Sequence, residues 1–244
     1  MTDAALDMSI AGMTPAPRNA AAPASPWHAR RLEGFGASDV AVLLAVTGRR
    51  EMSTLPRYLA DKAKPLRTKH GPAPRVVLER CGRPETKAGP AADIGKARER
   101  ELLDAWAATL TPFDDVEPAS LRHSSDAPGW VWPYPDRRCP RLAASLDAWG
   151  RDSWGDDIAI ELKCSRAVRD ALPWYWAAQV QAQLAASGLG LGLVVCGQEW
   201  SRSMTSTGPI DAWPVDRDEH VIDEIRASVV EAWAMVEKHR EAMR

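Results

Sequence analysis

A glutamate and a lysine stand two residues apart in "AIELKCS" (159–165), inside an otherwise apolar run. In an extended strand, residues two apart point to the same face, so Glu161 and Lys163 would lie side by side. Fourteen residues before Glu161, "ASLDAWG" offers a further carboxylate, Asp147. The intervening "GRDSWGDD" (150–157) has the composition of a turn, which predicts a hairpin that brings Asp147 beside Glu161.

Two carboxylates and a lysine at the edge of a strand could hold a magnesium ion. Mg²⁺ prefers oxygen ligands and takes one or two carboxylates, and water and phosphate oxygens complete its coordination. The lysine could then orient or deprotonate a metal-bound water, or neutralise charge that develops on a phosphoryl group. The pattern therefore predicts a metal site for phosphodiester hydrolysis.

The alternative is a surface ion pair, because a Glu-x-Lys pattern often arises in strands by chance and contributes little there. The neighbours Ile158, Ile160 and Leu162 favour the metal site, since they indicate a strand that is largely buried on both faces. A buried carboxylate needs a counter-charge or a metal ion.

The composition is that of one folded domain with an amino-terminal tail. Of the 244 residues, 45% are hydrophobic and 26% are charged, which are ordinary values for a globular domain. Residues 1–25 are rich in Ala, Pro, Ser and Met without apolar periodicity, so we expect a disordered tail followed by a single domain over 26–244. We find no apolar run of membrane-spanning length and no secretory signal pattern, and we expect a cytoplasmic protein.

The positions of the cysteines and of the charged residues indicate which metal centres and partners the protein could have. The four cysteines lie far apart and form no CxxC-type pair, which argues against a zinc or iron–sulfur centre and for reduced thiols. Residues 1–100 hold 17 Lys and Arg against 10 Asp and Glu, whereas residues 101–244 hold 14 against 23. The basic amino-terminal part could follow the phosphates of a nucleic acid, or it could be a solvated surface without a partner.

The elements expected before the hairpin are mainly helical. Ser38 or Asp39 can cap the first helix and Thr54 the second, and the third contains "GKARERELLDAWAATL". Caps and apolar periodicity predict these three helices over 37–47, 54–63 and 93–110. The stretch 64–92 has no clear assignment.

From about 115 to 165, short extended segments broken by Pro, Gly and Asp predict a meander of strands. A helix is expected over 173–188, where Gly188 would end it, followed by strands over 191–200 and near 209–215 and a closing amphipathic helix. Helices around a small mixed sheet give an α/β or α+β fold, of which we expect α/β.

Five segments, taken in order, resemble one nuclease family. They are "WHARRLEGFGASDV", "GKARE", "ASLDAW", "IELKCS" and "WAAQVQAQL". They are similar to the W-H-x-x-R and A-S-[DE]-V, G-K-x-x-E, S-P-D-G, E-L-K-C and A-Q-V-Q motifs of the lambda exonuclease / YqaJ-type viral recombinase family, within the PD-(D/E)xK nuclease superfamily. The match covers about 27 to 200 and implies a restriction-endonuclease-like core. The flanks of Asp147 depart from the family, with Leu146 and Ala148 in place of Pro and Gly.

The resemblance implies a role for each matching residue. Asp147 and Glu161 would be the metal ligands, with the backbone carbonyl of Leu162 as a third oxygen. Glu99 would complete the site or a second metal position. Lys163 would be the catalytic lysine.

Further positions follow from the same resemblance. Gln179 would orient the nucleophile or the scissile phosphate, while the role of Gln183, four residues on, stays open. The positions that in this family bind the 5′ phosphate of a DNA end are matched by Arg31, Ser38 and Ser145.

The predicted activity is that of a Mg²⁺-dependent 5′-to-3′ exonuclease, and Mn²⁺ should be able to substitute for Mg²⁺. The enzyme would digest one strand of double-stranded DNA and leave a 3′ overhang for recombination by strand annealing. The resemblance further implies a phage or prophage protein that forms a homotrimer around DNA and works with a single-strand annealing protein. Two alternatives stay open: another enzyme of the superfamily, such as an endonuclease or repair nuclease, and a catalytically silent DNA-end-binding protein. Trp130 and Trp132 are the tryptophans we would test as DNA wedges.

Overall fold

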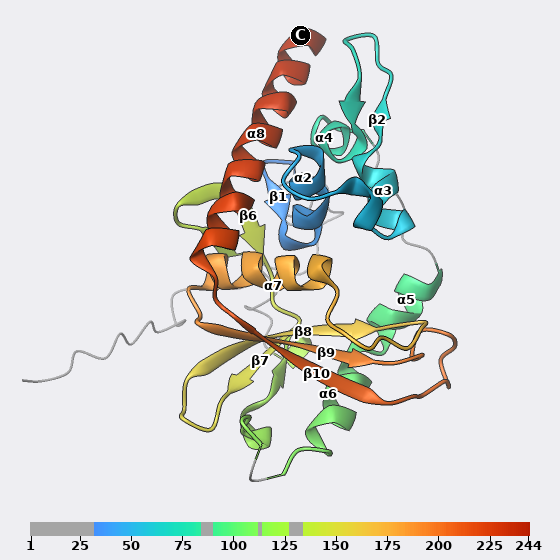
Figure 1. Cartoon of the computed structure of the whole chain (residues 1–244), viewed down its shortest axis with the longest axis vertical. Helices are drawn as coiled ribbons and strands as arrows, with labels where there is room; N and C mark the ends of the chain where they lie inside the picture. The colour runs from blue at the N-terminus through green and yellow to red at the C-terminus, as the bar shows by residue number, and fades with distance from the viewer. Residues whose placement is uncertain (1–31, 84–89, 112–113, 127–133) are drawn as a thin grey trace, which may run out of the picture.

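A mixed five-stranded sheet crosses the lower half of the computed structural model (Figure 1). The structure describes residues 32–83, 90–111, 114–126 and 134–244. The expected tail over 1–25, and with it Arg31, Trp130 and Trp132, lies outside the described residues. The strand order is β10 (Ile210–Asp216), β9 (Leu191–Gly197), β8 (Asp157–Cys164), β7 (Ala148–Arg151) and β4 (Arg122–His123).

Only the β8–β9 pair of this sheet is parallel, within the part of the chain that the structure describes. The crossover between these strands contains α7 (Trp174–Ser187), which ends at Gly188 in the left-handed conformation with φ +81°. Glycine adopts that conformation without the strain that a Cβ would add. The predicted mixed sheet, hairpin and helix are confirmed.

Both faces of β8 are buried, against different helices. Ile158, Ile160 and Leu162 pack on the side of α6 (Glu99–Ala107), whereas Ala159 packs on the side of α7. Since side chains alternate along a strand, Glu161 and Lys163 lie on the same face as Ala159. The two charged residues therefore face α7.

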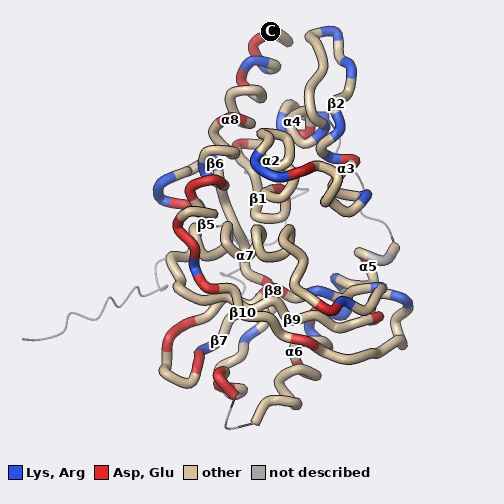
Figure 2. Tube along the Cα trace, viewed as in Figure 1, with Lys and Arg blue, Asp and Glu red and all other residues tan. Residues whose placement is uncertain are grey.

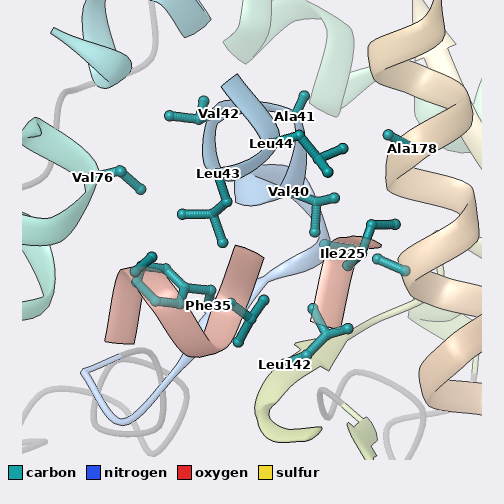
Figure 3. Packing of buried hydrophobic residues seen from close by; sticks show 14 of the residues in the cluster. Phe35, Val40, Ala41, Val42, Leu43, Leu44, Val76, Leu142, Ala178 and Ile225 are labelled. Carbon is teal, nitrogen blue, oxygen red and sulfur yellow. The ribbon is translucent and has the colours of Figure 1, made fainter. Parts of the chain in front are cut away.

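A helical layer covers α7 on the side away from the sheet (Figure 1). Its apolar side chains form one core together with residues of two short strands, and in this core Phe35, Leu43, Leu142 and Ile225 are at most 1% exposed (Figure 3). The helices of this layer are α2 (Val40–Val46), α3 (Arg57–Ala63), α4 (Arg75–Arg80) and the long closing helix α8 (Glu219–Met243).

Two small sheets and one more helix complete the described elements. The first sheet has the order β1 (Phe35–Gly36), β6 (Cys139–Ala144) and β5 (Tyr134–Asp136), and the second is the hairpin of β2 (Pro65–Leu66) and β3 (Ala73–Pro74). Lys and Arg gather on this hairpin (Figure 2). Helix α5 (Pro90–Ala97) precedes α6.

Three predicted helix details were wrong. The helix expected over 54–63 begins at Arg57, because Thr54 lies in a 3₁₀ turn where its hydroxyl donates to the Glu51 carbonyl at 2.7 Å. Asp39 occupies the N-cap position of α2, but neither its side chain nor that of Ser38 makes the expected capping hydrogen bond, and the chain enters that helix through a 3₁₀ turn over Ala37–Asp39.

The helix expected over 93–110 is broken at Arg98, whose φ is −108° and ψ 1°. The Arg98 side chain is 1% exposed and donates to the backbone carbonyls of Trp200, Ser203 and Ser206. A buried guanidinium needs such acceptors, and the three carbonyls supply them at the point where the helix is interrupted. The break makes Glu99 the first residue of α6.

The four cysteines are free, which agrees with the expected reduced thiols. None of the described helices combines the length and apolar character that a membrane crossing requires.

Candidate active site

The β7–β8 hairpin sets the distance between the two central carboxylates. Its register pairs Ala148 with Ile160, so one step further along the strands places Asp147 opposite Glu161. Asp147 Oδ2 accepts a hydrogen bond from the Leu162 N–H at 3.1 Å. Because the N–H and C=O of one strand residue point to the same side, the Leu162 carbonyl also points toward the edge that carries Asp147.

Glu161 is held by side chains from its own strand and from α7. The carboxylate is 2% exposed, and its Oε1 accepts hydrogen bonds from Lys163 Nζ and from Gln179 Nε2, the latter at 2.6 Å. Lys163 Nζ also donates to Gln179 Oε1 at 3.1 Å. The second oxygen, Oε2, accepts from Gln183 Nε2 at 2.5 Å. The structure thus brings the predicted residues Asp147, Glu161, Lys163 and Gln179 together.

Burial and neighbouring charges change the proton affinities of this cluster. Burial raises the pKa of Asp147 well above its usual range, and the charges of Glu161 and Glu99 raise it further. Burial lowers the pKa of Lys163, but the carboxylates of Glu161 and Asp147 raise it by more, so the net direction is upward. Lys163 is therefore a cation here, suited to neutralising charge rather than to accepting a proton.

Glu99 approaches the cluster of Asp147, Glu161 and Lys163 from α6, which packs on the face of β8 opposite to α7. Gly95 of α5 lies against Cys164 of β8, and the break at Arg98 follows, so that α6 starts beside the site. Burial raises the pKa of Glu99 to about 6, Lys96 lowers it, and Glu161 raises it. Glu99 thus acts electrostatically on the central carboxylates.

A cavity of about 610 Å³ adjoins Asp147 and Gln179. Both predicted phosphate-binding serines that are described, Ser38 and Ser145, line it, although they are more than 100 residues apart in the sequence. Two cationic residues that the sequence interpretation did not single out, Lys96 and Arg141, also line this cavity.

One wall of the cavity, residues 34–38, is fixed by a buried ion pair. Asp39 is fully buried, and its carboxylate binds Arg80 and accepts from the Gly36 N–H at 3.2 Å. Arg80 Nε donates to the Gly34 carbonyl at 2.7 Å. Neither role was predicted, because Asp39 has the sequence context of a helix cap and Arg80 lies in the stretch 64–92 without a clear assignment.

The donor set of this site fits a hard divalent cation. Asp147, Glu161 and the Leu162 carbonyl offer only oxygens, and Mg²⁺ takes one or two carboxylates. Burial first, and then the charges of Glu161 and Glu99, raise the pKa of Asp147, and a bound cation would stabilise its ionised form. Within the described residues, no group of three or more His, Cys, Asp or Glu side chains could hold a metal ion, so Glu99 does not complete a three-carboxylate centre in this arrangement.

No protein-family model matches the sequence, and no curated protein matches it. Solved structures do match. The alkaline exonuclease LHK-Exo from Laribacter hongkongensis is 19% identical with a TM-score of 0.56, over 89% of this chain and 94% of that one. A second structure of LHK-Exo, in complex with dAMP, is 18% identical with the same TM-score and coverage.

A phage-related exonuclease from Haemophilus somnus 129PT is 11% identical with a TM-score of 0.53, over 86% of this chain and 96% of that one. This chain has the fold of these exonucleases. The resemblance that the sequence motifs indicated is thus borne out as a likeness of fold to these exonucleases over most of the chain.

Proposed function

We propose that this chain is a Mg²⁺-dependent 5′-to-3′ exonuclease that digests one strand of double-stranded DNA from its end and leaves a 3′ overhang. One observation carries the proposal: Asp147, Glu161 and Lys163 meet at the end of one hairpin, beside a cavity that Ser38 and Ser145 line. The fold shared with exonucleases supports it.

Asp147, Glu161 and the Leu162 carbonyl would hold the cation. When bound, Mg²⁺ or Mn²⁺ supplies an activated water and stabilises the leaving oxygen. Lys163 remains protonated at neutral pH and stabilises the negative charge that develops on the phosphoryl group. Glu99 would add a carboxylate for a second cation.

The amide of Gln179 has a supporting role in this proposal. It contacts Lys163 and Glu161 and lines the cavity, so it keeps the lysine aimed at the reacting phosphate.

The cavity would receive the 5′ phosphate of a DNA end. The hydroxyls of Ser38 and Ser145 can donate to phosphate oxygens, and Lys96 and Arg141 make this cavity favourable for an anion. Arg31 would add a guanidinium. The structure of LHK-Exo with dAMP shows that a protein of this fold binds a nucleotide, which supports this part of the proposal.

Assembly and context follow the family resemblance. We infer a homotrimer around the DNA, a single-strand annealing protein as partner, and a phage or prophage origin in a bacterial cytoplasm. Sedimentation of the purified protein tests the first inference, which requires three times the mass of the 244-residue chain.

The proposal is tested by digestion in Mg²⁺ of a linear duplex that has one 5′-phosphorylated and one 5′-hydroxyl end. A covalently closed circle is incubated in parallel. We expect preferential loss of the strand with the 5′ phosphate, while the circle stays intact. The Lys163→Ala variant should be inactive, and Lys238→Ala, which removes an exposed lysine of α8, should match the wild type.

Either alternative would have a distinct outcome. Nicking of the closed circle would identify an endonuclease on the same fold. Tight binding of DNA ends without any cleavage in Mg²⁺ would identify a DNA-end-binding protein.

A further inference from the structure

Gln183 joins the two parts of the candidate site. Its side chain is 1% exposed on α7, and Nε2 donates to Glu161 Oε2 at 2.5 Å and to the Ser145 carbonyl at 3.1 Å. Ser145 begins the three-residue connection between β6 and β7 that ends at Asp147. One amide therefore holds a carboxylate on β8 and also the backbone that carries the other carboxylate.

The rest of this amide is not satisfied. Oε1 of Gln183 is buried and has no hydrogen-bond partner among the described residues. An unpaired buried amide oxygen destabilises a fold, and buried unsatisfied groups in native structures call for an explanation. An apolar residue of similar shape would remove that cost, so the amide is explained by the two bonds that Nε2 makes.

The connection between β6 and β7 also lines the cavity, through Ser145 and Asp147. Ser145 lines the cavity with Ser38, and its carbonyl is bound by Gln183 on the other side. A phosphate held by the Ser145 hydroxyl would therefore be connected to Glu161 through a single side chain.

We propose that Gln183 is a positioning residue that fixes the spacing of Asp147 and Glu161 and couples occupancy of the phosphate cavity to these carboxylates. The inference rests on the proposed function, in which the two carboxylates hold Mg²⁺ and the cavity holds a 5′ phosphate. Residues that orient metal ligands typically change metal affinity or activity by about 10- to 100-fold when they are replaced.

The test compares Gln183→Leu with Gln181→Leu. Gln181 is an equally suitable buried glutamine on the same helix, 6% exposed, but it binds the Asp216 carbonyl at 2.6 Å and the Asp218 N–H at 3.0 Å, away from the site. Circular dichroism would first establish that both variants are folded. Mg²⁺ binding without DNA is then measured by isothermal titration calorimetry, and cleavage rates are compared for duplexes with 5′-phosphate and 5′-hydroxyl ends.

Gln183→Leu should weaken Mg²⁺ binding by about 10- to 100-fold and reduce the preference for the phosphorylated end, whereas Gln181→Leu should keep both within about twofold. The proposal is overturned if Gln183→Leu keeps the wild-type Mg²⁺ affinity, or if the two variants have the same end preference. A wild-type protein that neither binds Mg²⁺ nor cuts DNA would instead refute the proposed function.

Discussion

Glu99 should make the metal-free protein less stable as the pH rises. Burial and the charge of Glu161 raise its pKa to about 6, compared with 4.5 for an ordinary glutamate. Below pH 4.5 the carboxyl group is protonated in both the folded and the unfolded chain. Between pH 4.5 and 6 the unfolded chain loses this proton first, so the free energy of unfolding falls and stays low above pH 6.

The size of this effect follows from the two pKa values. One pKa unit corresponds to about 1.36 kcal/mol, so the difference between 4.5 and about 6 amounts to about 2 kcal/mol of unfolding free energy. A neutral isostere, Glu99→Gln, lacks this dependence. We therefore expect Glu99→Gln to equal the wild type at pH 4 and to be about 2 kcal/mol more stable at pH 7.

Urea unfolding at several pH values between 4 and 7.5, in the presence of EDTA, measures this difference. Glu241→Gln, a change at an exposed glutamate of α8, is the control and should follow the wild type at every pH. A stability difference between Glu99→Gln and the wild type that does not vary with pH would refute the reasoning. So would a Glu99→Gln protein that is less stable than the wild type at pH 7.

Three further outcomes are expected. Lys163→Ala removes the cation beside a buried carboxylate and should lower the free energy of unfolding by about 3–5 kcal/mol in a urea titration, and an unchanged midpoint would contradict the buried ion pair. Ser38→Ala and Ser145→Ala should each reduce the preference for 5′-phosphorylated over 5′-hydroxyl duplexes in a strand-resolved gel, with no effect on folding; an unaltered preference would exclude the cavity as the phosphate site. Gly192→Ala would place a Cβ 2.4 Å from Val180 Cγ1 and should cost about 1–3 kcal/mol in thermal unfolding, which a neutral result would disprove.

The hairpin and its charged residues were predictable because their signals are local. Alternation around Glu161, the turn composition of 150–157 and the stop at Gly188 each depend on neighbouring residues, and the structure has all three. The motif order also predicted the fold that the solved exonucleases share.

The remaining features depend on contacts between distant segments. The acceptors of Arg98, at which the helix is interrupted, lie about 100 residues further along the chain. The carboxylate of Asp39, the N-cap residue of α2, binds Arg80 and does not cap that helix. Predictions from local helix propensity do not take such distant partners into account. Gln183 was recognisable only as a glutamine four residues after Gln179, which places it on the right face of the helix but does not identify what it binds.

The most direct test of the account is release of nucleotides from a 5′-phosphorylated linear duplex in Mg²⁺ by three proteins: the wild type, Glu161→Gln and Asp157→Asn. The two variants make the same chemical change on the same strand, but Glu161 is 2% exposed inside the site whereas Asp157 is an exposed residue paired with Arg151 at 3.4 Å. We expect the wild type and Asp157→Asn to digest the duplex equally. Glu161→Gln should be slower by at least about 10²-fold, because replacing even a residue that supports a metal ligand can cost that much. Equal digestion by Glu161→Gln would contradict the assignment of catalysis to this hairpin.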